Sequence, residues 1–357
     1  MDIINKFLEF DPFELDFNEK NKLFLESIFE LEEFHRKNCN EYSNISNNWP
    51  FKKGNENKLE NLPFIPVRLF KEFDLKSVGN EKIVKTMTSS GTTGQKVSKI
   101  YLDSVTSKNQ TIVLSRIVKN YLGSTRLPML IIDNKEVLRD RKSFSARGAG
   151  ILGFSIYGYD RKYILDQKFN LDFELLQDFI KKHENKEILL FGFTYIVWEY
   201  FKNSIEKNKI DIKIPKGILI HGGGWKKMLS QSVDSLTFKK EIKRISGISN
   251  VFNYYGMVEQ TGSIYMECEY GFFHVPIYSD ILIRNPKNFQ ICSIREMGII
   301  QLISLLPHSY PGHSIISEDL GIIHGVDDCK CGRKGKYFTI HGRLKNAEIR
   351  GCSDVLN

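Results

Sequence analysis

The chain has 357 residues, 41% of them hydrophobic, and its 51 basic and 43 acidic residues give a formal net charge of +8. The length favours one large α/β domain or two smaller ones, and the scattered basic residues, without a stripe or a reading motif, exclude a nucleic-acid binder. Because no apolar run approaches the roughly 20 residues of a membrane span, and because the N-terminus is acidic where a signal peptide is basic, we expect a cytoplasmic protein without a membrane span.

The first third of the chain predicts helices followed by two short strands. Residues 1–48 carry apolar side chains at helical spacing between charged residues. An extended segment follows at residues 63–70, where Pro63 and Pro66 restrict the backbone. Beyond it the pattern predicts a strand, a strand and a helix, at residues 82–87, 97–102 and 104–121.

The middle of the chain alternates strand-like runs with helical patterns. This alternation is typical of an α/β domain with largely parallel strands. The predicted strands cover residues 129–132, 188–191, 218–220 and 251–254. The predicted helices cover residues 173–182, 195–207 and 231–245.

The pattern changes at about residue 262 to short strands and turns. We expect a small antiparallel β subdomain there, over about residues 262–342, appended to the α/β core. The predicted strands cover residues 272–275, 281–283, 299–305, 321–324 and 337–340.

A Ser/Thr/Gly loop joins the two early strands. Its sequence is Thr88-Ser89-Ser90-Gly91-Thr92-Thr93-Gly94. The glycines let the backbone turn tightly and present N–H groups to an anion, and the hydroxyls are further donors for phosphate oxygens. The loop does not have Walker spacing, because Gln95 follows Gly94. Alone it indicates either a phosphate site or an ordinary turn.

Two glycine- and aromatic-containing turns follow predicted strands. The triple glycine Gly222, Gly223 and Gly224 permits close approach of a flat ligand to the backbone. Tyr255 could stack on a base, and Glu259, four residues further on, could hold Mg²⁺ beside phosphates.

Two later segments complete an ordered series of five elements. Asp319 offers a carboxylate for ribose hydroxyls, and Arg343 offers a planar cation for a phosphate. The series, over roughly residues 80–352, resembles the adenylate-forming superfamily of acyl-CoA synthetases, luciferases and peptide-synthetase adenylation domains. In detail it resembles the acyl-protein synthetases of the bacterial luminescence fatty-acid reductase system, with phenylacetate-CoA ligases as more distant relatives. The segments that carry this likeness are HGGGWKKM (221–228), NYYGMVEQTG (253–262), SEDLG (317–321) and GRLKNAEIRGCSD (342–354).

The resemblance implies an α/β fold over residues 1–342, the large N-terminal domain of adenylate-forming enzymes. It implies ATP and Mg²⁺ as cofactors and a carboxylic acid, a fatty acid, as substrate. The residues Thr88 to Gly94 would then cradle the ATP phosphates, and the triple glycine with Tyr255 and Gly256 would frame the adenine. Glu259 would bind Mg²⁺, Asp319 the ribose, and Arg343 would lie near the α-phosphate.

Two departures from the superfamily pattern stand out. The loop usually continues Gly-x-Pro-Lys, whereas here Lys96 stands one step early as a phosphate ligand. Acyl-CoA synthetases also carry a C-terminal lid domain with a lysine that assists adenylation, and here only 14 residues follow Arg343. We therefore expect a protein that lacks the lid domain and ends in a short tail, residues 343–357.

The tail holds Cys352, which matches the acyl-accepting cysteine of the acyl-protein synthetases by local motif. A thiolate can attack the mixed anhydride so that AMP departs, and the neighbouring Arg350 would lower the pKa of the thiol. The resemblance implies that Cys352 takes the acyl group as a thioester and passes it to an acyl-CoA-reductase-like protein subunit. Without the resemblance, Cys352 indicates only an exposed thiol near a chain end.

Three cysteines and a histidine in the β-rich region form a candidate zinc site. Cys268, His274, Cys329 and Cys331 could supply three thiolates and an imidazole to a tetrahedral structural Zn²⁺. The spacing is looser than that of a zinc finger, so unrelated free thiols with a surface histidine are the alternative.

Three functions remain open on the sequence. The first is an acyl-protein synthetase with Glu259, Arg343 and Cys352 as catalytic residues. The second is an acyl-CoA or acyl-carrier-protein ligase of the phenylacetate-CoA ligase type. The third is a non-catalytic adenylation-domain scaffold.

Overall fold

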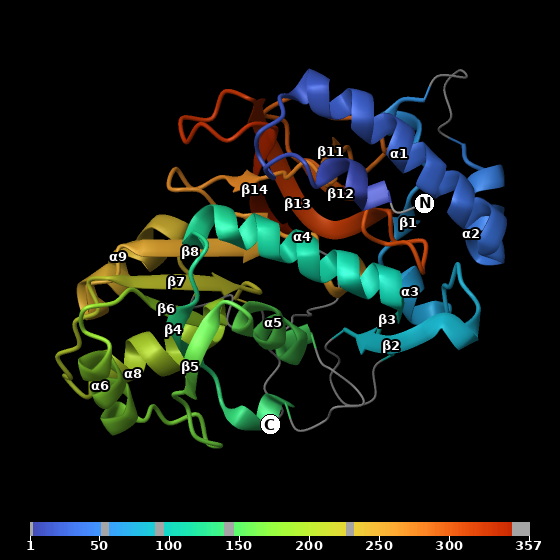
Figure 1. Cartoon of the computed structure of the whole chain (residues 1–357). Helices are drawn as coiled ribbons and strands as arrows, with labels where there is room; N and C mark the ends of the chain where they lie inside the picture. The colour runs from blue at the N-terminus through green and yellow to red at the C-terminus, as the bar shows by residue number, and fades with distance from the viewer. Residues whose placement is uncertain (1–2, 51–56, 90–95, 139–145, 226–231, 345–357) are drawn as a thin grey trace. The chain divides into compact units, whose positions relative to one another are not determined.

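The computed structural model describes residues 3–50, 57–89, 96–138, 146–225 and 232–344, and the rest is drawn as a grey trace in Figure 1. The described residues divide into two compact units. The first holds those of residues 3–121 and 256–344, and the second holds those of residues 122–255. No helix in the described ranges is long and apolar enough to cross a membrane.

The second unit is built on a parallel sheet in the order β5–β4–β6–β7–β8 (Figure 1). Every residue of β4, β6 and β7 is buried, as expected of parallel strands covered on both faces. The predicted α/β alternation with largely parallel strands is confirmed. The bounds are β4 Leu127–Ile132, β5 Gly158–Tyr163, β6 Ile188–Phe193, β7 Gly217–Gly222 and β8 Asn250–Tyr255.

Two helices of the second unit, α6 and α9, begin at side-chain caps. Asp172 accepts a hydrogen bond from the N–H of Leu175 at the start of α6, and Asp234 accepts one from Thr237 at the start of α9. The single helix predicted at residues 195–207 has a π-helical turn, Val197–Lys202, in its middle. The bounds are η4 Lys135–Leu138, α5 Ala146–Ser155, α6 Phe173–Lys182, α7 Thr194–Ile196, α8 Asn203–Lys207 and α9 Ser235–Ser246.

The first unit contains an antiparallel sheet in the order β10–β14–β13–β12–β11, and β1 pairs in parallel with β13. The predicted antiparallel region is confirmed. β13 is much longer than the predicted strand at residues 321–324, because the stretch before it also pairs, with β12 from Ser314 on and with β14 from Asp319 on. The bounds are β1 Ile65–Pro66, β9 Tyr265–Met266, β10 Phe273–His274, β11 Ser279–Arg284, β12 Gly298–Ser304, β13 Ser314–Val326 and β14 Lys336–Arg343.

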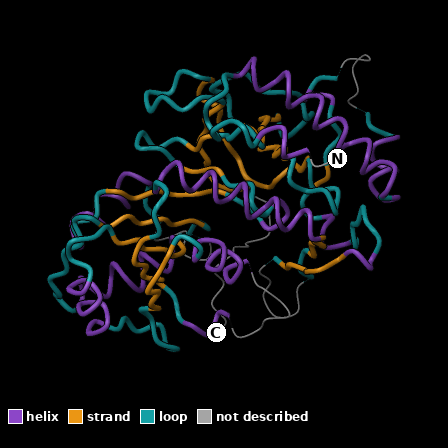
Figure 2. Tube along the Cα trace, viewed as in Figure 1, coloured by secondary structure: helices purple, strands orange, loops and turns teal. Residues whose placement is uncertain are grey.

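The remaining elements of the first unit are a hairpin and helices, shown in orange and purple in Figure 2. The hairpin pairs β2 with β3. Asp16 and Glu19 form a capping box at the start of α1. The bounds are η1 Ile3–Phe7, α1 Phe17–Asn38, α2 Asn40–Asn47, η2 Leu59–Asn61, α3 Leu69–Glu72, η3 Asn80–Lys82, β2 Ile83–Thr88, β3 Lys99–Asp103, α4 Ser104–Leu122 and η7 Val258–Gln260.

A buried charge network attaches α1 to the antiparallel sheet. Lys20 Nζ donates to the carbonyl oxygen of Ser279 at 2.5 Å and lies 3.3 Å from Asp280 Oδ2. Lys336 Nζ from β14 donates to the other oxygen of Asp280 at 2.7 Å. Removing the carboxylate would leave two buried ammonium groups unpaired, so the network specifies how the helix packs on the sheet.

Candidate nucleotide site and metal centre

The β2–β3 hairpin forms the base of the predicted phosphate loop. Thr88 pairs with Lys99 at the end of β2. Ser89 then closes the loop, because its N–H donates to the carbonyl of Ser98 at 3.1 Å and its Oγ accepts from the N–H of Ser98 at 2.9 Å. The predicted phosphate ligands Ser90, Gly91, Thr92, Thr93 and Gly94 lie outside the described residues.

Lys96 lies just beyond the loop and is held by an ion pair on the surface. Its Nζ lies 3.0 Å from Glu72 Oε2, and the two side chains are 71% and 51% exposed. An ion pair this exposed contributes at most about 1 kcal/mol. The lysine can therefore leave Glu72 for a phosphate at little cost.

The triple glycine ends β7 in the second unit. A Cβ atom at Gly222 would lie 2.5 Å from the ring of Tyr254, and one at Gly223 would lie 2.8 Å from the ring of Phe193. Gly223 and Gly224 have φ of +84° and +66°, a conformation that favours glycine. Tyr255, the predicted adenine contact, ends the neighbouring strand β8.

Below this turn a side-chain pair holds the glycine backbone. Thr194 Oγ1 lies 3.1 Å from the carbonyl oxygen of Gly222 and 2.9 Å from His221 Nδ1. Because the hydroxyl has one proton, both contacts are satisfied when Thr194 donates to Gly222 and His221 donates to Thr194. Burial lowers the pKa of His221 to about 3, so the ring is neutral at ordinary pH.

Glu259 lies in the short turn η7 of the first unit, and Gly256 lies just before this turn. Glu259 is only 6% exposed, and the neighbouring Gln260 is also buried. A carboxylate placed here is shielded from bulk water, which strengthens its interaction with a cation.

Asp319 and Arg343 are brought together across two paired strands. They are direct partners in the β13–β14 register, and Arg343 Nε donates to Asp319 Oδ1 at 3.0 Å. The arginine side chain is 37% exposed. Residues expected to contact the ribose and the α-phosphate therefore lie side by side.

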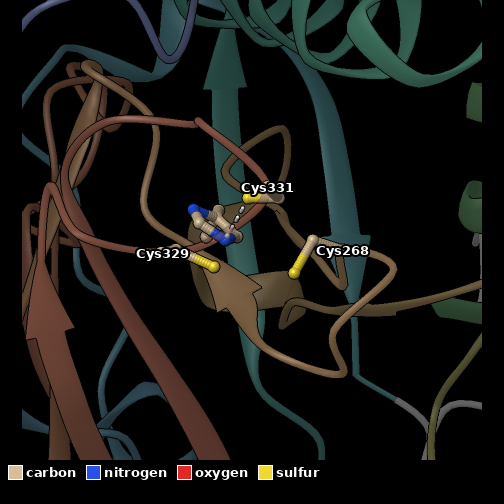
Figure 3. A group of neighbouring side chains, drawn as sticks. Cys268, Cys329 and Cys331 are labelled. Atoms are coloured by element: carbon tan, nitrogen blue, oxygen red, sulfur yellow. Dashed lines mark hydrogen bonds between the residues drawn. The ribbon is translucent and has the colours of Figure 1, made fainter.

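The Cys/His cluster (Cys268, His274, Cys329 and Cys331) is assembled from segments far apart in the sequence. One ligand atom from each residue lies within 4.8 Å of all the others. Cys268 follows β9, His274 lies in β10, and the other two cysteines follow β13. Figure 3 shows the three labelled cysteine side chains gathered close together. Cys331 Sγ lies 3.2 Å from His274 Nε2.

The chemistry of these four groups fits a thiophilic metal ion. Burial raises the pKa of Cys268, raises that of Cys329 to about 12, and lowers that of His274 to about 4. Without a metal ion Cys268, Cys329 and His274 are therefore neutral near pH 7, and a bound cation would displace the thiol protons. Arg333, which stacks 4.2 Å from the ring centroid of Tyr121, brings a positive charge close to Cys331. The cluster can hold a metal ion.

Cys352, the predicted acyl acceptor, lies outside the described residues. Of the described cysteines outside the cluster, Cys39 is buried and Cys292 is partly exposed. Burial raises the pKa of both thiols, which makes each a poor nucleophile near neutral pH.

Comparison with solved structures identifies the fold. The fold is similar to that of 2-hydroxyisobutyryl-CoA ligase with bound 2-HIB-AMP and CoA, with a TM-score of 0.72 at 14% identity over 94% of this chain and 77% of that one. The postadenylation state of that ligase gives a TM-score of 0.71 at 15% identity, over 93% and 69% of the two chains. The chain therefore has the fold of an adenylate-forming ligase.

Sequence comparison then shows the family. The family model described as "Acyl-protein synthetase, LuxE" matches residues 1–357. A long-chain-fatty-acid–luciferin-component ligase of Aliivibrio fischeri is 25% identical over 365 residues, covering 96% of this chain and 90% of that protein. The chain belongs to the acyl-protein synthetase family and is an ATP-dependent ligase, as the motif order indicated.

Proposed function

We propose that this protein activates a fatty acid with ATP to give acyl-AMP and pyrophosphate, and then transfers the acyl group to Cys352. The observation that carries the proposal is the match of the acyl-protein synthetase model to all 357 residues. The five motif elements in the superfamily order support it.

In the first step a fatty-acid carboxylate oxygen attacks the α-phosphorus of ATP, and the bond to pyrophosphate breaks. Glu259 is proposed to hold Mg²⁺ beside the phosphates, and Arg343 to lie near the α-phosphate. The pairing of Arg343 with Asp319 at 3.0 Å supports a joint role, because one side chain of each charge then faces the ribose and phosphate of a single nucleotide.

In the second step the Cys352 thiolate attacks the acyl carbonyl carbon. A C–S bond forms, the C–O bond to AMP breaks, and AMP leaves with the electron pair. We further propose that the thioester passes to a partner protein subunit of the acyl-CoA-reductase type.

The Cys/His cluster is proposed to hold one structural Zn²⁺. Three thiolates and one imidazole match the closed four-coordinate sites that zinc prefers. Three of the four residues are buried, which favours a structural rather than a catalytic role.

The deciding experiment follows a labelled fatty acid. With ATP and Mg²⁺, we expect the label to stay on denatured protein and to be released by neutral hydroxylamine. Cys352→Ser should remove the label and leave acid-dependent pyrophosphate exchange largely intact, because adenylation precedes transfer. Cys292→Ser, the matched control, should label as wild type does.

Two outcomes would decide against this reading. Normal labelling of Cys352→Ser would place the nucleophile elsewhere. Free acyl-CoA accumulating without any protein label would favour a ligase that delivers its acyl group to coenzyme A.

A further inference from the structure

The connection between β12 and β13, residues 305–313, contacts two nucleotide elements of the first unit at adjacent residues. None of its side chains belongs to the motif series. Ser309 reaches the hairpin below the phosphate loop, and Tyr310 reaches the Glu259 turn. The inference drawn from these contacts rests on the proposed function.

Tyr310 contacts the backbone of Glu259 itself. Its hydroxyl donates to the carbonyl oxygen of Glu259 at 2.9 Å, and the side chain is fully buried. Burial raises the pKa of Tyr310, so the phenol keeps its proton and remains a donor. Without this donor the buried carbonyl oxygen of Glu259 would be left unsatisfied, and the turn would have to shift for the oxygen to find water or another donor.

A second contact joins the same turn to the connection, this time from a side chain of the turn, Gln260, to the backbone of Gly312. Gln260 Nε2 donates to the carbonyl oxygens of Gly312 at 2.8 Å and Leu302 at 3.1 Å. Gly312 lies so close that an added Cβ would be 2.8 Å from the carbonyl oxygen of Glu259. The turn and the connection therefore fit together at three points, and Glu259 has little freedom to shift.

Ser309 makes the second attachment. Its Oγ donates to the carbonyl oxygen of Tyr101 in β3 at 2.7 Å. Its N–H donates to Thr106 Oγ1 at the start of α4, at 3.1 Å. β3 pairs with β2, and the same hairpin is closed by the contacts between Ser89 and Ser98 at the base of the loop. Ser309 thus holds β3, the strand of the hairpin that follows the phosphate loop.

We propose that Ser309 and Tyr310 are positioning residues that set the separation between the β2–β3 hairpin, at the base of the phosphate loop, and the turn that carries Glu259. Consecutive Cα atoms are about 3.8 Å apart whatever the loop does. Anchoring both elements on adjacent residues therefore joins them through almost no flexible chain. A misplacement of about 1 Å between groups that act on one substrate can cost about a hundredfold in rate. Contacts that fix the separation of the hairpin and the Glu259 turn would therefore affect the rate of the reaction with ATP.

The test deletes one hydroxyl at a time and follows pyrophosphate exchange. Tyr310→Phe and Ser309→Ala should each lower kcat/KM about five- to tenfold, mainly through a higher KM for Mg·ATP. The matched controls are Tyr278→Phe, whose buried hydroxyl bonds to Arg116, and Ser246→Ala, whose hydroxyl bonds to Ile242. These controls should stay within about twofold of wild type while losing similar thermal stability.

A double-mutant cycle tests whether Tyr310 acts through Glu259. In a Glu259→Gln background the effect of Tyr310→Phe on KM for Mg·ATP should fall to less than about twofold. An effect that persists undiminished there would overturn the positioning role.

Equilibrium binding separates this inference from the proposed function. Calorimetry with Mg·ATP should show about five- to tenfold weaker binding for Tyr310→Phe than for wild type. Binding equal to wild type would overturn the positioning role. Wild-type protein that binds Mg·ATP but shows no acid-dependent pyrophosphate exchange would instead refute the proposed function.

Discussion

The Cys/His cluster and the Asp319–Arg343 pair belong to the same unit and involve the same sheet, yet they are held in different ways. The four cluster residues converge within 4.8 Å and three of them are buried. Arg343 is 37% exposed and is held on Asp319 by an ion pair. A packed cluster keeps its geometry without a ligand, whereas an exposed pair can exchange its partner for a nucleotide. The first region should therefore govern folding stability, and the second should govern turnover.

The largest expected effect is the loss of a cluster thiol. Cys329→Ser should abolish the binding of about one Zn²⁺ per chain and lower the free energy of unfolding by about 3 kcal/mol or more, because metal binding is coupled to folding. Elemental analysis and urea unfolding would measure this, with Cys292→Ser as the unchanged control. Wild-type protein that contains no zinc and is no more stable than Cys329→Ser would show that the cluster does not govern folding stability.

A buried histidine extends the comparison to the second unit. The pKa of His221, lowered by burial to about 3, means that only the unfolded chain gains its proton as pH falls below about 6.5. Its contribution to stability is complete above pH 6.5 and is lost towards pH 3, by about 2 kcal/mol at pH 5. His221→Asn keeps a donor for Thr194 but does not titrate, so its unfolding free energy should fall less steeply with acid. An unchanged slope in urea unfolding between pH 6.5 and 5 would contradict this.

Loss of a side chain proposed to act on the nucleotide should lower activity and leave zinc binding unchanged, the opposite of what is expected for the loss of a cluster thiol. Glu259→Ala, and likewise Thr92→Ala, should lower pyrophosphate exchange at least about tenfold, the scale of 1.4 kcal/mol of transition-state stabilisation. Zinc content should stay at the wild-type level in both variants. Wild-type exchange rates in both would remove their assigned roles.

The smallest effect is expected at Lys96. Lys96→Ala should change the unfolding free energy by less than about 1 kcal/mol, because its pair with Glu72 is exposed. If Lys96 binds a phosphate, the variant should raise the KM for ATP by about two- to fivefold. Glu72→Gln, which releases the lysine, should leave that KM the same or lower. A higher KM in Glu72→Gln than in Lys96→Ala would show that the ion pair itself is what matters.

Much of the secondary structure could be predicted because its signals are local. The apolar runs in β4, β6 and β7 and the amphipathic pattern of α6 depend on neighbouring residues alone. The strand β5, with the sequence GYDRKY, was missed because its charged side chains at the sheet edge do not alternate as a half-buried strand would. The first half of β13 was missed because its acidic residues favour a turn until two partner strands pair with it.

By itself, the sequence determined the order of the nucleotide motifs and the chemical identity of the cluster, because few residue types serve as phosphate-binding turns or thiophilic ligands. Only the tertiary structure decided that Cys268 and Cys331 meet, and that Lys20 is neutralised by Asp280. It alone showed Ser309 and Tyr310 bracing the hairpin and the Glu259 turn. Each of these contacts joins residues distant in the chain, and their free energy comes from burial and pairing that exist only once the sheet has formed. Residue type could nominate the ligands of the cluster, but no local pattern of residues can reveal the contacts of Lys20, Ser309 and Tyr310.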